Sequence, residues 1–160
     1  MKILNIITKI LEFICFALML TMMIVTFAQV VRRVCFGSAF FWAEECTILA
    51  MVWSAFLGSA VAMGRGAHTR IDAAINLLPG KGKQIMDIID YIVVGVFVVL
   101  LGNYSLPIIE TTGRMLTTGM KIPRSILYYS VLFGSVLIAI YCVVLAIKAI
   151  IDFKKPQEEN

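Results

Sequence analysis

The sequence predicts an all-α integral membrane protein with four transmembrane helices and short interfacial amphipathic helices. Of its 160 residues, 61% are hydrophobic and 15% are charged, whereas a typical soluble domain is about 45–50% apolar and about 25% charged. A soluble fold of this length could not hide so much apolar surface from water. In addition, four long segments contain no Asp, Glu, Lys, Arg or His: 13–31, 46–64, 91–109 and 125–147.

The lengths of these four uncharged segments fit a lipid bilayer. The shortest have 19 residues, and at about 1.5 Å per residue a helix of that length reaches about 28 Å, close to the roughly 30 Å hydrocarbon layer. A helix also satisfies its own backbone hydrogen bonds, as lipid requires. We therefore predict a single membrane domain over 1–160, with spans at about 13–31, 42–64, 88–109 and 124–148.

The first span is expected to remain as a helix, because its apolar run is too long for a secretory signal and no cleavage pattern follows Ala28. Before it, Ile3, Ile7 and Ile10 share one helical face of residues 2–12. Two interpretations of this segment stay open. It forms either a helix at the cytoplasmic interface that leads into the first span or a plain extension of that span.

Residues 70–78 are the second predicted interfacial helix. Thr69 and Asp72 match a capping box, with a hydroxyl at the N-cap and an acid three residues on. Apolar residues then recur at helical spacing until a Pro-Gly pair ends the pattern. Pro107 predicts a kink or an end late in the third span, and the polar tail 154–160 is expected to be disordered.

The distribution of basic residues predicts the orientation of the chain. Nine Lys and Arg residues flank the two termini and the loop between spans two and three, whereas the opposite side has five: Arg32, Arg33, Arg114, Lys121 and Arg124. The positive-inside rule therefore places both termini in the cytoplasm. Because the basic residues behind the net charge of +4 flank membrane spans, we expect membrane lipids and no nucleic acid among the partners.

The second span carries a stripe of small residues. They recur at every fourth position: Cys46, Ala50, Ser54, Gly58, Ala62 and Gly66. Small side chains at this spacing let another helix approach closely in a membrane. Rows at i+4 tilt across the helix axis, so the stripe can serve more than one neighbour. We expect the second span to be central and largely shielded from lipid.

The sequence offers little chemistry for transport or catalysis. The middle of every span lacks charge, and Asn103 is the most polar residue there, whereas ion-coupled transporters usually keep ionisable groups near the midplane. The single histidine, His68, lies at a membrane edge and supports neither a haem nor a catalytic pair. We expect no enzyme activity, no cofactor and no metal. Cys35 and Cys46 could form a disulfide near one face, but unpaired thiols are the favoured interpretation.

Two adjacent acids, Glu44 and Glu45, follow Trp42 at the start of the second span. In one interpretation they only complement the helix dipole, at about 0.3–1 kcal/mol each, and Trp42 anchors the helix at the interface. The two side chains point about 100° apart on a helix, so they cannot easily face the same environment. In the second interpretation at least one therefore meets Arg32, Arg33 or a basic residue of another subunit.

A set of residues in this order and spacing carries a family resemblance: Trp42-x-Glu44-Glu45, Trp53, Phe56-Leu57-Gly58, Gly64-Arg65, His68-x-x-x-Asp72 and Ile122-Pro123. It resembles the small membrane subunit of tripartite ATP-independent periplasmic (TRAP) transporters and covers almost the whole chain. Together with the stripe, it makes seven residues candidates for a subunit interface: Trp42, Glu44, Glu45, Ala50, Trp53, Ser54 and Gly58. Arg65, His68 and Asp72 form a candidate motif at the cytoplasmic edge.

The resemblance implies a division of labour among three proteins. In that family a periplasmic substrate-binding protein captures an organic acid, such as a sialic acid or a C4-dicarboxylate, and a large membrane subunit moves it, driven by a sodium gradient. This chain would be the small non-catalytic scaffold, in a heterodimer with the large subunit in the bacterial inner membrane, and could help dock the binding protein. Alternatives from other classes are a self-sufficient homo-oligomeric transporter and a membrane anchor of a redox enzyme.

Overall fold

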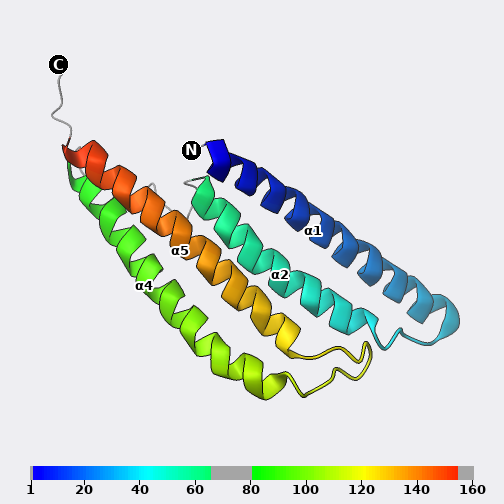
Figure 1. The fold of residues 1–160 in the computed structure, drawn as a ribbon. Helices are drawn as coiled ribbons and strands as arrows, with labels where there is room; N and C mark the ends of the chain where they lie inside the picture. Colours follow the sequence, from blue (N-terminus) through cyan, green and yellow to red (C-terminus); the bar gives the residue numbers. More distant parts are fainter. Residues whose placement is uncertain (1, 66–80, 155–160) are drawn as a thin grey trace.

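The part of the chain that the structure describes forms four long α-helices. The computed structural model describes residues 2–65 and 81–154, and its helices are α1 (Lys2–Phe36), α2 (Ala43–Gly64), α4 (Lys81–Thr112) and α5 (Ser125–Lys154) (Figure 1). In these two ranges no strand is present, and one isolated β-bridge joins Leu116 to Pro123 in the α4–α5 connection. The predicted all-α membrane fold is confirmed.

Each helix contains a segment that is long and apolar enough to cross a membrane: Ile6–Phe36, Ala43–Gly64, Ile88–Thr112 and Ser125–Ile151. Each segment overlaps one predicted span. Residues 2–12 belong to α1 without a break, so this segment and the first span form one helix. α4 continues past Pro107 to Thr112, so this proline does not end the helix. The predicted helix at 70–78 and the tail after Lys154 lie outside the described residues.

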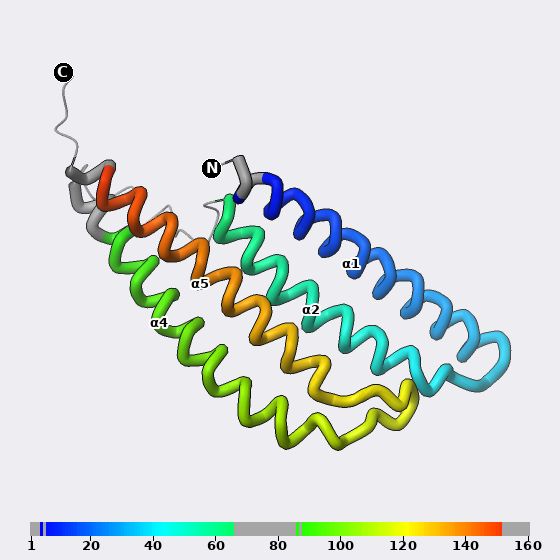
Figure 2. The backbone as a smooth tube through the Cα atoms, viewed as in Figure 1, coloured from blue at the N-terminus to red at the C-terminus, as the bar shows by residue number. Residues whose placement is uncertain are grey.

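The helices lie side by side in one open row, in the order α1, α2, α5 and α4 (Figure 1 and Figure 2). α2 contacts α1 on one side and α5 on the other, and α5 in turn contacts α4. α1 and α4 are thus the two edges of the row. α2 is central, as predicted, but a helix inside a single row keeps two uncovered faces.

The most extensive packing in the row surrounds α5. A cluster of buried side chains joins α2, α4 and α5: Ala60, Met63, Tyr91, Val98, Ile138, Tyr141 and Cys142. A Cβ atom at Gly134 would lie 2.7 Å from the Cβ of Phe56, and one at Gly102 would lie 3.0 Å from the Oγ of Ser135. These two glycines therefore let α5 approach α2 and α4 closely, as is common for helices in membranes.

α1 is the most exposed of the four helices. In its most apolar 18-residue window only 6% of the residues are buried, against 33% in α5. Phe13, Phe16, Met23 and Phe27 are between 64% and 73% exposed. An apolar surface of this extent is covered by lipid or by a partner helix rather than by water.

Candidate subunit-interface site

Glu45 binds the connection between α4 and α5. Its Oε1 accepts hydrogen bonds from the Thr118 hydroxyl at 3.0 Å and from the Gly119 backbone N–H at 2.8 Å. Its Oε2 accepts a third bond from the Met120 backbone N–H at 2.7 Å. Hydrogen bonds to an ionised carboxylate are roughly twice as strong as neutral ones. Glu45 therefore ties the first turn of α2 to residues 113–124, a partner that neither sequence interpretation included.

Gly119 brings this connection against the start of α2. A Cβ atom at Gly119 would lie 2.4 Å from the carbonyl oxygen of Phe41 and 2.9 Å from the Cα of Trp42. Only glycine can approach another backbone so closely. Lys121 has a φ of 53°, a left-handed conformation that non-glycine residues rarely adopt. In this tight segment, the adjacent N–H groups of Gly119 and Met120 both point to Glu45.

The neighbouring candidates, Trp42 and Glu44, face outward. Glu44 is exposed, and Trp42 is 42% exposed, with its ring 5.4 Å from the ring of Phe40. The guanidinium of Arg32 lies 3.8 Å from the centre of the Phe40 ring, which is a cation–π contact. Because Glu45 binds the α4–α5 connection and Glu44 is exposed, Glu44 is the one of the two acids that is available to a second protein chain.

The small-residue stripe of α2 turns from the inside of the chain to the outside. Ala50 is 5% exposed and so packs within this chain. Ser54 is half-buried, and its hydroxyl donates a hydrogen bond of 2.9 Å to the backbone carbonyl of Met51 in the same helix. A Cβ atom at Gly58 would have no neighbouring atom within 4 Å. The tilt of i+4 rows explains this change, and it leaves open space beside Gly58.

Trp53 faces α5. The side chain is half-buried, and its ring lies 6.5 Å from the ring of Phe133. The next residue of α5, Gly134, lies against Phe56 of α2. Trp53 and Phe56, two residues of the family-like pattern, thus take part in packing within this chain.

Two polar contacts join three helices at the other end of α2. The Nε of Arg65 donates a hydrogen bond to the Oε1 of Glu12 at 2.5 Å, and this bond raises the pKa of Arg65. The hydroxyls of Thr8 and Tyr141 lie 2.8 Å apart in a buried contact. Gly64 leaves room for them, since a Cβ atom there would lie 2.9 Å from both the Thr8 hydroxyl oxygen and the Tyr141 Cε1.

The remaining candidates are distributed as follows. His68 and Asp72 of the cytoplasmic-edge motif lie outside the described residues. All four cysteines are free thiols, and Asn103 is exposed on α4. Among the described residues, no group of three His, Cys, Asp or Glu side chains could hold a metal ion. The polar contacts found at both ends of α2 join parts of the chain to one another.

Comparison with known proteins identifies the family. Residues 22–151 match the family described as "Tripartite ATP-independent periplasmic transporters, DctQ component". A Haemophilus influenzae protein named "Putative TRAP transporter small permease protein" is 34% identical over 83 residues, which are 52% of this chain and 52% of that protein. A Vibrio cholerae protein named "C4-dicarboxylate TRAP transporter small permease protein DctQ" is 30% identical over 74 residues, or 46% and 32% of the two chains.

These alignments cover about half of the first relative and about a third of the second. The family match covers most of this chain and includes all four helices in whole or in part. The family consists of transporter components and is not a class of enzymes. This multi-pass membrane protein therefore belongs to the DctQ component family of TRAP transporters.

Proposed function

We propose that this chain is a small non-catalytic scaffold subunit that braces a large TRAP membrane subunit in a heterodimer. The open row of helices is the observation that carries the proposal. α2 has open space beside Gly58, and most of the large apolar side chains of α1 are exposed. A partner helix that packs against such surfaces gains contacts that lipid does not fully replace.

The transport role proposed for the complex follows from the family. The large subunit moves an organic acid, of the sialic acid or C4-dicarboxylate class, with a sodium gradient, and a periplasmic substrate-binding protein supplies it. The name of the Vibrio cholerae relative contains C4-dicarboxylate. The proposed location is the bacterial inner membrane with both termini in the cytoplasm, because nine of the 14 basic residues flank that side. Exposed Glu44 then lies on the periplasmic side, where the binding protein arrives.

Reconstitution tests the division of labour. The chain alone in liposomes is expected to give no sodium-dependent uptake of sialic acid or C4-dicarboxylates, whereas the complete three-protein system gives uptake of its substrate. Uptake by the isolated chain would replace the scaffold with the self-sufficient homo-oligomeric transporter. Haem or quinone bound by the isolated chain would instead favour the redox anchor.

A pair of glycine variants tests the interface. Gly58→Leu should leave the small subunit folded, because nothing in this chain lies within 4 Å of the new Cβ, and should reduce both co-purification with the large subunit and uptake. Gly134→Leu is the matched control, because Phe56 of the same chain fills that space. It should lower the expression of the small subunit itself.

Two outcomes would contradict this interface. If Gly58→Leu retains normal assembly and uptake, the large subunit does not bind beside Gly58. If Gly58→Leu loses its own expression as Gly134→Leu does, the position serves the fold of this chain.

Glu44→Gln should reduce uptake without loss of expression, because Glu44 is exposed.

A further inference from the structure

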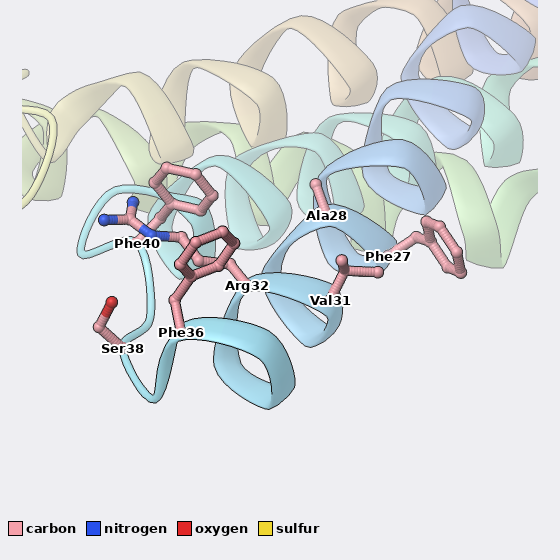
Figure 3. Close-up of a pocket in the computed structure, with 7 residues that line it drawn as sticks. All are labelled: Phe27, Ala28, Val31, Arg32, Phe36, Ser38 and Phe40. Carbon is pink, nitrogen blue, oxygen red and sulfur yellow. The ribbon is translucent and has the colours of Figure 1, made fainter.

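A groove at the end of α1 combines one cationic side chain with an apolar wall. Its volume is about 810 Å³, and it is lined by residues from the end of α1 and from the α1–α2 connection: Phe27, Ala28, Val31, Arg32, Phe36, Ser38 and Phe40. In Figure 3, the guanidinium of Arg32 lies beside the Phe40 ring at one end of the groove, and Phe27 lies at the other. The groove is therefore polar at one end and apolar along the rest.

The positive charge of Arg32 is not balanced by an acid within the described residues. Arg32 is not part of a salt bridge there, and its contact is the Phe40 ring at 3.8 Å from the guanidinium. A cation–π contact does not use the five N–H groups of a guanidinium, which lie in its plane, as donors to an acceptor oxygen. Pairs of these N–H groups match the spacing of two oxygens of a phosphate or carboxylate.

The position of the groove along α1 fits the boundary between acyl chains and headgroups. The apolar segment Ile6–Phe36 has 31 residues, about 46 Å at about 1.5 Å per residue, so it exceeds the roughly 30 Å hydrocarbon layer. Arg32 and Arg33 directly follow the uncharged segment 13–31, so the last turns of α1, with Arg32 and Phe36, are expected at the headgroup layer. Phe27 lies five residues before Arg32, about 7.5 Å deeper along the helix axis.

We propose that this groove binds a membrane phospholipid, with its phosphate at Arg32 and Ser38 and an acyl chain along Ala28 and Phe27. A water-soluble phosphate would leave the apolar wall uncovered. A protein helix in the groove would bury the guanidinium, which is costly unless that helix supplies an acid. A phospholipid satisfies both parts of the groove with one molecule. This proposal requires insertion in a membrane but does not rest on the scaffold role.

Ligand titration tests the two halves of the proposed site separately. The purified full-length chain in detergent is titrated with phosphatidylglycerol and, in parallel, with a diacylglycerol that has the same acyl chains but no phosphate. Native mass spectrometry reports the bound fraction. Phosphatidylglycerol should bind at least about tenfold more tightly, because only it supplies an anion for the guanidinium. Glycerol phosphate, which has no acyl chains, should not displace it; displacement would assign the site to a free phosphate and overturn the proposal.

Two matched pairs of variants locate the binding. Arg32→Gln should weaken phosphatidylglycerol binding about tenfold, whereas Arg33→Gln, which removes the same charge from an exposed neighbour outside the groove, should change it less than about twofold. Ala28→Phe fills the apolar wall and should also weaken binding. Ala17→Phe adds the same ring to another exposed position of α1 and should have no effect. All four changes lie at positions that are not buried, so unfolding midpoints in detergent should confirm intact folds.

Other results would overturn the proposal. Equal losses for Arg32→Gln and Arg33→Gln would mean attraction by general charge rather than a site. Unchanged binding in both Arg32→Gln and Ala28→Phe would mean that lipid binds elsewhere. If these two variants keep lipid binding but no longer co-purify with the large subunit, the groove belongs to a protein interface.

Discussion

The two ends of α2 are held in different ways. At its first turn, the contacts involve backbone: Gly119 lies against Phe41, and two N–H groups bind Glu45. At its last turn, the contacts are made by side chains: Thr8 of α1 and Tyr141 of α5 meet beside Gly64, and Arg65 pairs with Glu12. A backbone contact admits one geometry, whereas a side-chain contact can be exchanged or lost singly. The first end should therefore be the less tolerant of substitution.

The largest effect is expected from Gly119→Ala. The new Cβ would lie 2.4 Å from the carbonyl oxygen of Phe41, so the α4–α5 connection must move away from α2 and weaken the bonds to Glu45. Overpacking of this kind costs about 1–3 kcal/mol, occasionally more. The measurement is the free energy of unfolding in detergent micelles titrated with SDS.

Gly58→Ala is the control for this substitution. The same methyl group enters open space in a helix interior, where replacing glycine by alanine stabilises by about 0.5–1 kcal/mol. The two variants should therefore shift the unfolding free energy in opposite directions. A Gly119→Ala protein as stable as the unmodified chain would show that the close backbone contact does not hold this end of α2.

The next largest effect is expected from Glu45→Gln. An amide keeps one acceptor oxygen but turns an NH₂ group toward the donors of residues 118–120, so at least one of the three hydrogen bonds is lost. Hydrogen exchange of peptides covering 114–122 should accelerate at least about tenfold. Glu44→Gln, which changes the exposed neighbour, should leave that exchange rate unchanged. Equal acceleration in both variants would mean that helix charge, rather than the contact with the connection, sets the stability of this end.

The sequence was sufficient for the fold class, because each span is a long uncharged run whose length matches a bilayer. It was not sufficient for the roles of Glu44 and Glu45. The pattern showed that the two acids point in different directions, but the partners of Glu45 lie 73 to 75 positions later in the chain. The close approach of Gly119 has no local signal either, since a glycine in a connection is common and the backbone it contacts is distant in sequence.

The role of the small-residue stripe of α2 could also be predicted only in part from the sequence. Its spacing predicted close helix packing, and Ala50 is buried. The spacing could not show that a Cβ atom at Gly58 would have no neighbour within 4 Å. This depends on which sides of α2 are occupied by α1 and α5. The arrangement of the helices in an open row could not be predicted either. Uncharged segments show how many spans there are but not which helices lie next to one another.

At the last turn of α2, Tyr141→Phe should have a moderate effect. The substitution removes one buried hydroxyl and leaves the Thr8 hydroxyl with its second bond, to the carbonyl of Leu4 at 2.9 Å. A loss of about 0.6–1.5 kcal/mol is expected. Thr8→Val alone and the double variant complete a cycle, and a coupling energy near zero would show that the two hydroxyls do not stabilise each other.

The smallest effect is expected from Arg65→Gln. The side chain of Arg65 is 62% exposed and that of Glu12 is 28% exposed, so solvent and salt screen the pair. The SDS unfolding midpoint should fall less than it does in Tyr141→Phe, and high salt should remove the difference from the unmodified chain. The exchanged pair, Glu12→Arg with Arg65→Glu, should restore the midpoint if attraction between the two charges is what matters. A loss larger than that of Tyr141→Phe would mean that this end of α2 depends on its ion pair, and that exposure does not predict which contact holds the helices together.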